Sequence, residues 1–432
     1  MSRRRVVVTG AGCVTPFGVG RDTFARALKG GQSAARMIEQ FDTTGLPTRF
    51  AAPLPMEDRE LEDLLDNPKT GKTLSRAGKM AVIAAQEAYR TSGLDGNHVD
   101  PYRIGITLGS GGLGSVDLDP TLKTFDLMKL VLVENGHADQ ANAFWQRSLK
   151  LIHPLSPLTT LPNIPTAHIA IQYNVRGSSQ TITTACTSSA QAIGEAYRAI
   201  KHDYADAMIT GGSDSMVNPN GLVAFSALGV LSKNNDEYRS ASRPFDARRD
   251  GFMIGEGAAI FILEEWEHAR SRGAKILAEV AGFGTASDAF RLTDEPPDAH
   301  GAIHAMTSAL KDADMQGHLV DYVNAHGTGT KQNDRAETKA IKAVFDGGPP
   351  PVSSTKSMIG HLVAAAGAVE FMTSCIAMSD GFLPPTINYE APDPECDLDY
   401  VPNDARTTKT QCIMSNSFGF GGQNASLILR RV

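Results

Sequence analysis

The feature that most constrains the fold is an internal repeat, because segments of the second part of the chain resemble segments of the first part. The segment ILAEVAGFGTAS at 276–287 resembles VVVTGAGCVTPF at 6–17, because each is an apolar strand pattern that leads into a Gly-x-Gly turn. The segment VSSTKSMIGHLVAAAGAVE at 352–370 repeats the strand, turn and small-residue helix pattern of TITTACTSSAQAIGEAYRA at 181–199. Since the order of these segments is kept, we predict two similar α/β halves packed face to face, at 1–273 and 274–432.

Charge and cysteine content exclude several classes of protein. The chain of 432 residues carries a formal net charge of −7, which argues against a general nucleic-acid binder. Its 5 cysteines form no CxxC pair, which predicts reduced thiols and a cytoplasmic protein. No apolar run approaches the length of a membrane span, and no secretory signal pattern precedes the first strand.

The predicted turn at Cys186 is the first chemically distinctive feature. Cys186 follows a β-rich run at 181–184 and precedes a small-residue helical pattern. The helix dipole and free backbone N–H groups at such a position favour the thiolate form of a cysteine. The alternative is a buried core cysteine, which is where a free cysteine usually lies. Three polar stretches later in the chain favour the reactive interpretation.

These stretches supply partners for Cys186 at other predicted strand-to-helix turns. NAHGTGT places His326 just after an apolar strand pattern, and STKSMIGHL places Lys356 and His361 at the start of a helix pattern. Each residue has an ordinary alternative, namely a histidine that caps a turn, a solvated lysine and a core histidine. Turns of this kind gather at one side of an α/β core, so we expect the four side chains to meet there.

The glycine-rich loop NSFGFGG could aim backbone N–H groups at a ligand, although Phe418 and Phe420 could also be core residues. Two histidines and a lysine exceed what a cysteine hydrolase needs, since that reaction requires one histidine base and an orienting acid or amide. The set suits a reaction that acylates the thiol and then stabilises an enolate. A metal site at His326 and His361 is an alternative for which the sequence offers no evident third close ligand.

The motifs TACTS, NAHGTGT, STKSMIGH, NSFGFGG, RPFDARRDGF and GEG resemble those of the β-ketoacyl-[acyl carrier protein] synthases of the condensing-enzyme family. The likeness runs from residue 4 to 431 and is closest to the elongating type II synthases. It implies a thiolase fold of class α/β, with duplicated halves in a five-layer αβαβα arrangement, and a homodimer. It also implies no cofactor of the enzyme's own, because the phosphopantetheine arm belongs to the acyl carrier protein substrate.

The resemblance further implies a catalytic set of Cys186, His326, His361 and Lys356. An acyl chain would pass from acyl carrier protein to Cys186, and malonyl-carrier protein would then lose CO2 while His326 and His361 stabilise the enolate. The resulting carbanion would attack the acyl thioester and give a 3-oxoacyl chain two carbons longer. The backbone N–H groups of Cys186 and Phe420 would form the oxyanion hole, with Phe420 also acting as a gate.

The resemblance assigns roles to further positions. Glu337, as the partner of Lys356, and Phe418 would support the catalytic set. The hydroxyl groups that would bind the pantetheine arm are those of Thr328, Thr330 and, more weakly, Thr293. A structural monovalent cation, Na⁺ or K⁺, would lie at Asn324, Ala325, Glu370, Ser415 and Asn416. For Glu370 the alternative is a buried, hydrogen-bonded carboxylate. Because the carrier protein is acidic, a basic patch should flank the tunnel; the candidates are Lys69, Lys72, Arg76, Lys79, Arg147 and Lys150.

The sequence departs from the family pattern at 117–155, which is longer than in housekeeping members and where helices are predicted at 124–133 and 141–151. This departure leaves open both fatty-acid elongation and a discrete type II polyketide or secondary-metabolite ketosynthase that acts on an unusual primer. Another alternative is a non-catalytic partner subunit resembling chain-length factors, which replace the cysteine that this chain keeps. The last is a hydrolase or plain acyltransferase that uses Cys186 with one histidine.

Overall fold

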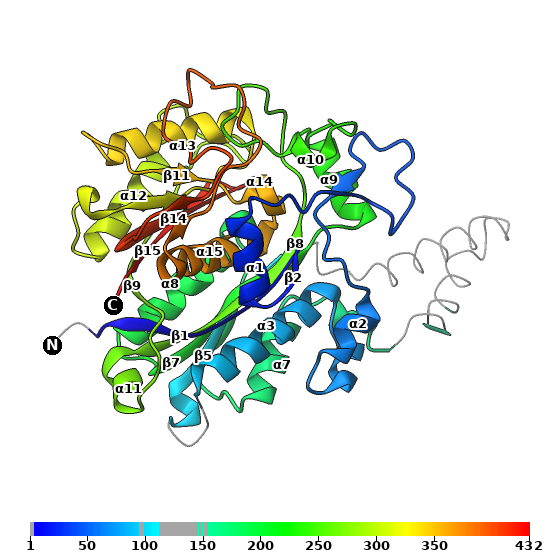
Figure 1. The fold of residues 1–432 in the computed structure, drawn as a ribbon. Helices are drawn as coiled ribbons and strands as arrows, with labels where there is room; N and C mark the ends of the chain where they lie inside the picture. Colours follow the sequence, from blue (N-terminus) through cyan, green and yellow to red (C-terminus); the bar gives the residue numbers. More distant parts are fainter. Residues whose placement is uncertain (1–3, 95–98, 112–145, 147–148, 151–153) are drawn as a thin grey trace.

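The computed structural model describes residues 4–94, 99–111, 146, 149–150 and 154–432 (Figure 1). The predicted helix at 124–133, and nearly all of the one at 141–151, lie outside these ranges. No helix within the described ranges is long and apolar enough to cross a membrane.

Strands from the first part of the chain form one half of a large mixed sheet. They are β1 (Val6–Thr15), β5 (Ile104–Ser110), β6 (Ser179–Ile182), β7 (Ala207–Ser215) and β8 (Glu256–Glu265), and the short β2 (Gly18–Val19) pairs with β1. Their order in the sheet is β6-β5-β7-β8-β1. β6, β5 and β7 run parallel, whereas β8 is antiparallel to both β7 and β1.

Strands from the second part repeat this topology. They are β9 (Ala278–Ser287), β10 (Tyr322–Asn324), β11 (Val352–Ser353), β14 (Cys412–Gly419) and β15 (Gln423–Arg430), in the order β11-β10-β14-β15-β9. Numbered by appearance, both sets have the order 3-2-4-5-1, with the first three strands parallel and the last two pairings antiparallel. The sets join where Val6 of β1 pairs with Val280 of β9. The predicted boundary at residue 273 stays a prediction.

Helices lie on the outer faces of the two sets of strands and between them (Figure 1). α3 (Arg76–Ser92) packs on β1 and β8, whereas α12 (His300–Asp312) packs on β9 and β15, with α13 (Lys331–Val344) beside it. α8 (Ser188–Lys201) and α15 (Ala366–Asp380) pack against each other, and each contacts strands of both sets. Helix, sheet, helix pair, sheet and helix therefore form five layers, which confirms the predicted α/β arrangement.

α3 shows how the sequence sets these boundaries. The helix begins after Ser75, whose side chain accepts the backbone N–H of Gly78, and it ends at Gly93, which adopts a φ of 62°. Its buried face consists mainly of alanine with Met80 and Ile83, so the helix approaches the strands closely.

The remaining elements connect these layers. The helices are α1 (Arg21–Lys29), α2 (Asp58–Asp63), α6 (Ser156–Thr159), α7 (Ile164–Gln172), α9 (Pro219–Ala227), α10 (Tyr238–Ala241), α11 (Trp266–Ser271) and α14 (Lys356–Ile359). The short 3₁₀ segments in the described part of the chain are η1 (Pro68–Thr73), η2 (Pro101–Arg103), η3 (Ala185–Thr187), η4 (Gly317–Leu319) and η5 (Val363–Ala365). Within the described ranges, β3 (Arg36–Met37) pairs with β4 (Phe50–Ala51), and β12 (Phe382–Leu383) pairs with β13 (Arg406–Thr407), each as a small antiparallel two-stranded sheet.

Candidate active site

Cys186 lies in a strained turn between β6 and α8. The preceding Ala185 has a φ of 50°, a left-handed conformation that is costly for a residue with a side chain. The hydroxyl of Ser188 holds the turn, because it accepts the N–H of Thr184 at 2.9 Å and donates to the carbonyl of Ala185 at 2.7 Å. Cys186 is therefore fixed just before the first turn of a central helix.

The second half carries a matching turn before α15. Val363 has a φ of 47°, which is a pronounced outlier for a β-branched residue. The left-handed residue precedes the helix start by the same interval in both halves, from 185 to 188 and from 363 to 366. His361 stands just before this turn, and its Nδ1 accepts the N–H of Val363 at 3.2 Å. The duplicated topology thus presents Cys186 and His361 from matching turns, with Cys186 one residue after the left-handed position and His361 two residues before it.

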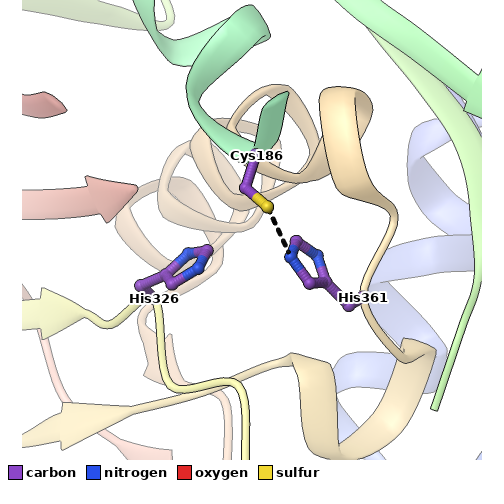
Figure 2. A group of neighbouring side chains, drawn as sticks. All are labelled: Cys186, His326 and His361. Carbon is purple, nitrogen blue, oxygen red and sulfur yellow. Dashed lines mark hydrogen bonds between the residues drawn. The ribbon is translucent and has the colours of Figure 1, made fainter. Parts of the chain in front are cut away.

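Cys186, His326 and His361 form one cluster (Figure 2). The Nε2 of His361 lies 3.0 Å from the Sγ of Cys186, and the two imidazole rings meet edge to face with centroids 5.3 Å apart. One potential ligand atom from each residue lies within 4.8 Å of the others. Cys186 therefore supplies a third potential ligand atom that was not evident from the sequence. The three atoms could hold a soft divalent ion such as Zn²⁺.

Hydrogen bonds fix the tautomers of both histidines. Because the Nδ1 of His361 accepts a backbone N–H, the proton of its neutral ring lies on Nε2, toward Cys186. The Nδ1 of His326 lies 3.3 Å from the Nζ of Lys356, which leaves the proton of that ring on Nε2. Burial lowers the pKa of both histidines well below the usual range, and the charge of Lys356 adds to this effect. Both rings are therefore neutral N–H donors.

The Cys186 side chain is a neutral thiol at rest. Burial raises its pKa to about 12, although the charge of Lys356 and a hydrogen bond from the N–H of Phe420 oppose this rise. This rise runs against the expected preference for a thiolate at this turn, because desolvation opposes the helix dipole. The bond from Phe420 does place one of the two predicted oxyanion-hole donors at the sulfur.

Lys356 and Glu370 form a buried ion pair behind the histidines, with side chains 1% and 2% exposed. Lys356 also donates to the backbone carbonyl of His326. Glu337 does not pair with Lys356 but accepts the N–H groups of His326 and Gly327 at 2.9 and 2.7 Å. Burial raises the pKa of both carboxyl groups to about 7. The two glutamates therefore position the lysine and the histidine loop respectively.

A cavity of about 450 Å³ opens onto the cluster. The predicted site residues that line it are Cys186, His326, His361, Thr293, Thr328, Thr330, Phe418 and Phe420. Phe225 and Phe252 contribute apolar wall, and the loop after Thr293 adds Asp294 and Glu295. Burial, with the nearby carboxylates of Asp288, Asp334 and Asp294, raises the pKa of Glu295 to about 7. Sequence reasoning missed Glu295, although it lies two residues after the predicted Thr293 in RLTDEPP.

The candidate cation residues are all buried; they are Asn324, Ala325, Glu370, Ser415 and Asn416. Within the described ranges, Glu370 Oε2 and both polar side-chain atoms of Asn324 have no hydrogen-bond partner. The amide oxygen of Asn416 instead accepts the hydroxyl of Ser426 at 2.8 Å. Since carboxylate and amide oxygens suit hard cations, Glu370 and Asn324 fit a Na⁺ or K⁺ ion.

Two of the six residues predicted for the basic patch are neutralised inside the protein. Arg76 pairs with Glu256 at 2.9 Å and with Asp58, and Lys79 pairs with Asp58 at 3.0 Å. Both sit in the first turn of α3, where these carboxylates converge. The assignment of Arg76 and Lys79 to a carrier-protein surface was therefore wrong. Lys69, Lys72 and Lys150 are exposed, whereas Arg147 lies outside the described residues.

Comparisons with known proteins point to one family. The family models described as Beta-ketoacyl synthase, N-terminal domain, and Beta-ketoacyl synthase, C-terminal domain, match residues 3–269 and 277–390. A 3-oxoacyl-[acyl-carrier-protein] synthase 2 of Coxiella burnetii is 41% identical over 100% of both chains. The ketoacyl synthase alpha subunit of the tetracenomycin polyketide synthase of Streptomyces glaucescens is 38% identical over 100% of this chain and 98% of its own. A solved type II polyketide ketosynthase, bound to a hexaketide and in complex with its acyl-carrier protein, has a TM-score of 0.87 at 32% identity, with 100% of both chains covered.

With these relatives beside it, the five-layer architecture is the thiolase fold, and the chain is an acyl-transferring condensing enzyme of that fold. It belongs, over both of its halves, to the beta-ketoacyl synthase family. The resemblance drawn from the TACTS, NAHGTGT, STKSMIGH and NSFGFGG motifs is confirmed.

Proposed function

We propose that this chain is a 3-oxoacyl-[acyl-carrier-protein] synthase, in which Cys186 carries the acyl chain. The observation that carries the proposal is the 3.0 Å contact between the Nε2 of His361 and the Sγ of Cys186, beside a second neutral histidine. The threonines Thr328, Thr330 and Thr293 line the cavity that a phosphopantetheine arm must enter to reach the sulfur.

In the first half-reaction, the Sγ of Cys186 attacks the acyl thioester of acyl carrier protein. Cys186 attacks as the thiolate, and the proton that its thiol gives up is taken by the departing pantetheine thiolate, so the charges balance. The N–H groups of Cys186 and Phe420 hold the tetrahedral oxyanion. Phe420 is half-buried beside Cys186 and would act as the gate of the pocket.

In the second half-reaction, malonyl-carrier protein loses CO2 and leaves an enolate. The Nε2–H groups of His326 and His361 donate hydrogen bonds to the enolate oxygen. The two imidazole rings are neutral before the negative charge develops on that oxygen. The carbanion then attacks the carbonyl of the acyl-Cys186 thioester, and the cysteine leaves as a thiolate that takes up a proton. Lys356 and Glu337 position His326, and Phe418, whose ring centroid lies 5.9 Å from that of His326, supports it.

A bound Na⁺ or K⁺ would be coordinated by the unpartnered oxygens of Glu370 and Asn324. Ala325, Ser415 and Asn416 could add backbone carbonyl or side-chain oxygens. No chemical step passes through this ion. The five buried free cysteines suit a cytoplasmic enzyme. The thiolase-like halves would be 1–273 and 274–432.

We expect a homodimer formed along the edge strand β6. In the described part of the sheet, β6 pairs with β5 only, and Ser179 and Gln180 are exposed. Ile171 of α7, a helix that packs on β6, is 78% exposed, and Leu161, three residues before α7, is 45% exposed. An unpaired strand edge with exposed apolar side chains on the helix beside it suits an interface.

The test is intact-mass spectrometry of the protein with a panel of acyl-carrier proteins, then malonyl-carrier protein, beside Cys186→Ala. An acyl adduct on the wild type alone, discharged as a chain two carbons longer, supports the proposal. No adduct with any donor would favour a non-catalytic partner subunit, and discharge as free acid would favour a hydrolase. The second candidate, a polyketide ketosynthase, is favoured by the 38% identity to the tetracenomycin subunit and predicts adducts only with unusual primers.

A further inference from the structure

Asp214 is a buried carboxylate that the proposed mechanism does not use. It lies near the end of β7 with 1% of its surface exposed, and it has no ion-pair partner among the residues that the structure describes. Its Oδ1 accepts the N–H of Ser215 at 2.8 Å, and its Oδ2 accepts the N–H of Ala364 at 3.0 Å. A buried carboxylate held only by backbone N–H groups is costly, so its place calls for a physical reason.

That reason lies at the start of α15. The N-terminus of a helix leaves several N–H groups without partners. Here the residues at the cap positions of η5 and α15, Leu362 and Ala365, provide no side-chain hydrogen bond. The bonds come instead from the first half of the chain, since Asp214 binds the N–H of Ala364 and the hydroxyl of Ser189 accepts the N–H of Ala368 at 2.9 Å.

The N–H of Ala364 follows directly in the chain after the N–H of Val363, which orients the imidazole of His361. Val363 directs its own N–H to the Nδ1 of His361 while holding a φ of 47°. Such a strained residue persists only where neighbouring contacts over-determine it. The bond from Ala364 to Asp214 is one of these contacts, and it acts on the very next peptide unit.

The surroundings of Asp214 leave it little room to move. A Cβ atom on Gly111 would lie 2.4 Å from Asp214 Oδ2, so the backbone at Gly111 comes directly against the carboxylate. The segment η5, which carries Ala364, packs on β7. A displacement of Asp214 would therefore be transmitted to the His361 turn.

We propose that Asp214 is a positioning residue that fixes the tautomer and direction of the His361 imidazole through the Ala364–Val363 turn. This inference rests on the proposed function, because it concerns the ring that would stabilise the enolate. Asparagine is the informative replacement: it has the same size but offers one acceptor oxygen where Asp214 satisfies two N–H groups.

The experiment is a double-mutant cycle on malonyl-carrier-protein decarboxylation, with wild type, Asp214→Asn, His361→Ala and the double variant. Asp214→Asn should lower kcat by up to about 100-fold with a smaller change in KM, because a small misdirection of a reacting group has effects of that size. In the His361→Ala background the same change should have no further effect. An equal loss in both backgrounds would overturn the proposal.

Asp246→Asn is the control, because Asp246 is also fully buried and accepts the backbone N–H groups of Arg248, Glu390 and Ala391, without contacting either histidine. Unlike Asp214, it also pairs with the side chain of Arg248. Asp246→Asn should lower the melting temperature without any coupling to His361.

A measurement on the wild type keeps the test independent of variant folding. In protein labelled with ¹⁵N-histidine, the His361 signals, assigned by their loss in His361→Ala, should show a proton on Nε2 and a hydrogen-bonded Nδ1. A proton on Nδ1 would overturn the inference even if Asp214→Asn cannot be purified. Failure of the proposed function would look different, since the wild type would then show neither decarboxylation nor an acyl adduct.

Discussion

The Nζ of Lys356 lies 3.3 Å from the Nδ1 of His326, and this contact determines which ring nitrogen of His326 carries the proton. We predict that Lys356→Met lowers malonyl-carrier-protein decarboxylation by up to about 100-fold, because His326 is then free to protonate Nδ1 and turn its acceptor toward the enolate. The loss should appear in kcat, measured at saturating substrate.

The same variant should lose stability by about 3–5 kcal/mol, because Glu370 is left as an unpaired buried carboxylate. The double variant Lys356→Met/Glu370→Gln removes that charge and should recover most of the stability in urea unfolding. It should not recover decarboxylation. Recovery of the rate together with the stability would mean that Lys356 acts only as a structural cation.

The Cys186 thiol provides a second prediction, because burial raises its pKa to about 12. Only the thiolate reacts readily with iodoacetamide, so alkylation of Cys186 should accelerate roughly tenfold per pH unit from pH 7 to 10, without a plateau. The rate is measured by intact mass, with Cys186→Ala as the control for the other four cysteines. A plateau below pH 8 would show that the free enzyme holds a preformed thiolate.

The sequence was sufficient to predict the duplicated architecture and the Cys186, His326, Lys356 and His361 cluster, because strand-to-helix turns meet at one place in such a fold. It could not predict the protonation of Cys186, since helix position and burial act in opposite directions and burial depends on tertiary packing. It also could not assign Glu370 rather than Glu337 as the carboxylate partner of Lys356, because both distances arise from the folded core.

The misassigned basic patch has a similar cause. Arg76 and Lys79 look like surface cations on one helical turn, but their partners Asp58 and Glu256 come from distant parts of the sequence. Asp214 was not predicted from the sequence for the same reason, because nothing near it in the sequence shows that it accepts the N–H of Ala364 at the start of α15.

The unpartnered oxygen of Glu370 leads to a third prediction, on monovalent cations. If Glu370 and Asn324 hold Na⁺ or K⁺, the melting temperature should rise from choline chloride to KCl or NaCl at equal ionic strength, since a ligand of the native state stabilises it. Asn324→Ala should abolish this difference while keeping the Lys356–Glu370 pair. An equal melting temperature of the wild type in all three salts would contradict the site.

The last prediction concerns Glu295 at the wall of the cavity, where burial raises its pKa from 4.5 to about 7. Between pH 4.5 and 7 the native protein binds more protons here than the unfolded chain does, so this group's contribution to stability falls as the pH rises. Removing the carboxyl group should therefore increase stability most at high pH. Glu295→Gln should be more stable than wild type by about 1–3 kcal/mol at pH 8 and nearly equal to it at pH 4.5.

Glu279 supplies a control of opposite sign, because Arg5 and Arg430 overcome the effect of its burial and lower its pKa. Glu279→Gln should be less stable than wild type at pH 8, and that deficit should shrink toward acid. Urea unfolding of both variants at the two pH values measures these differences, and a Glu295→Gln advantage that is the same at pH 4.5 and pH 8 would mean that the gain comes from packing and not from the buried charge.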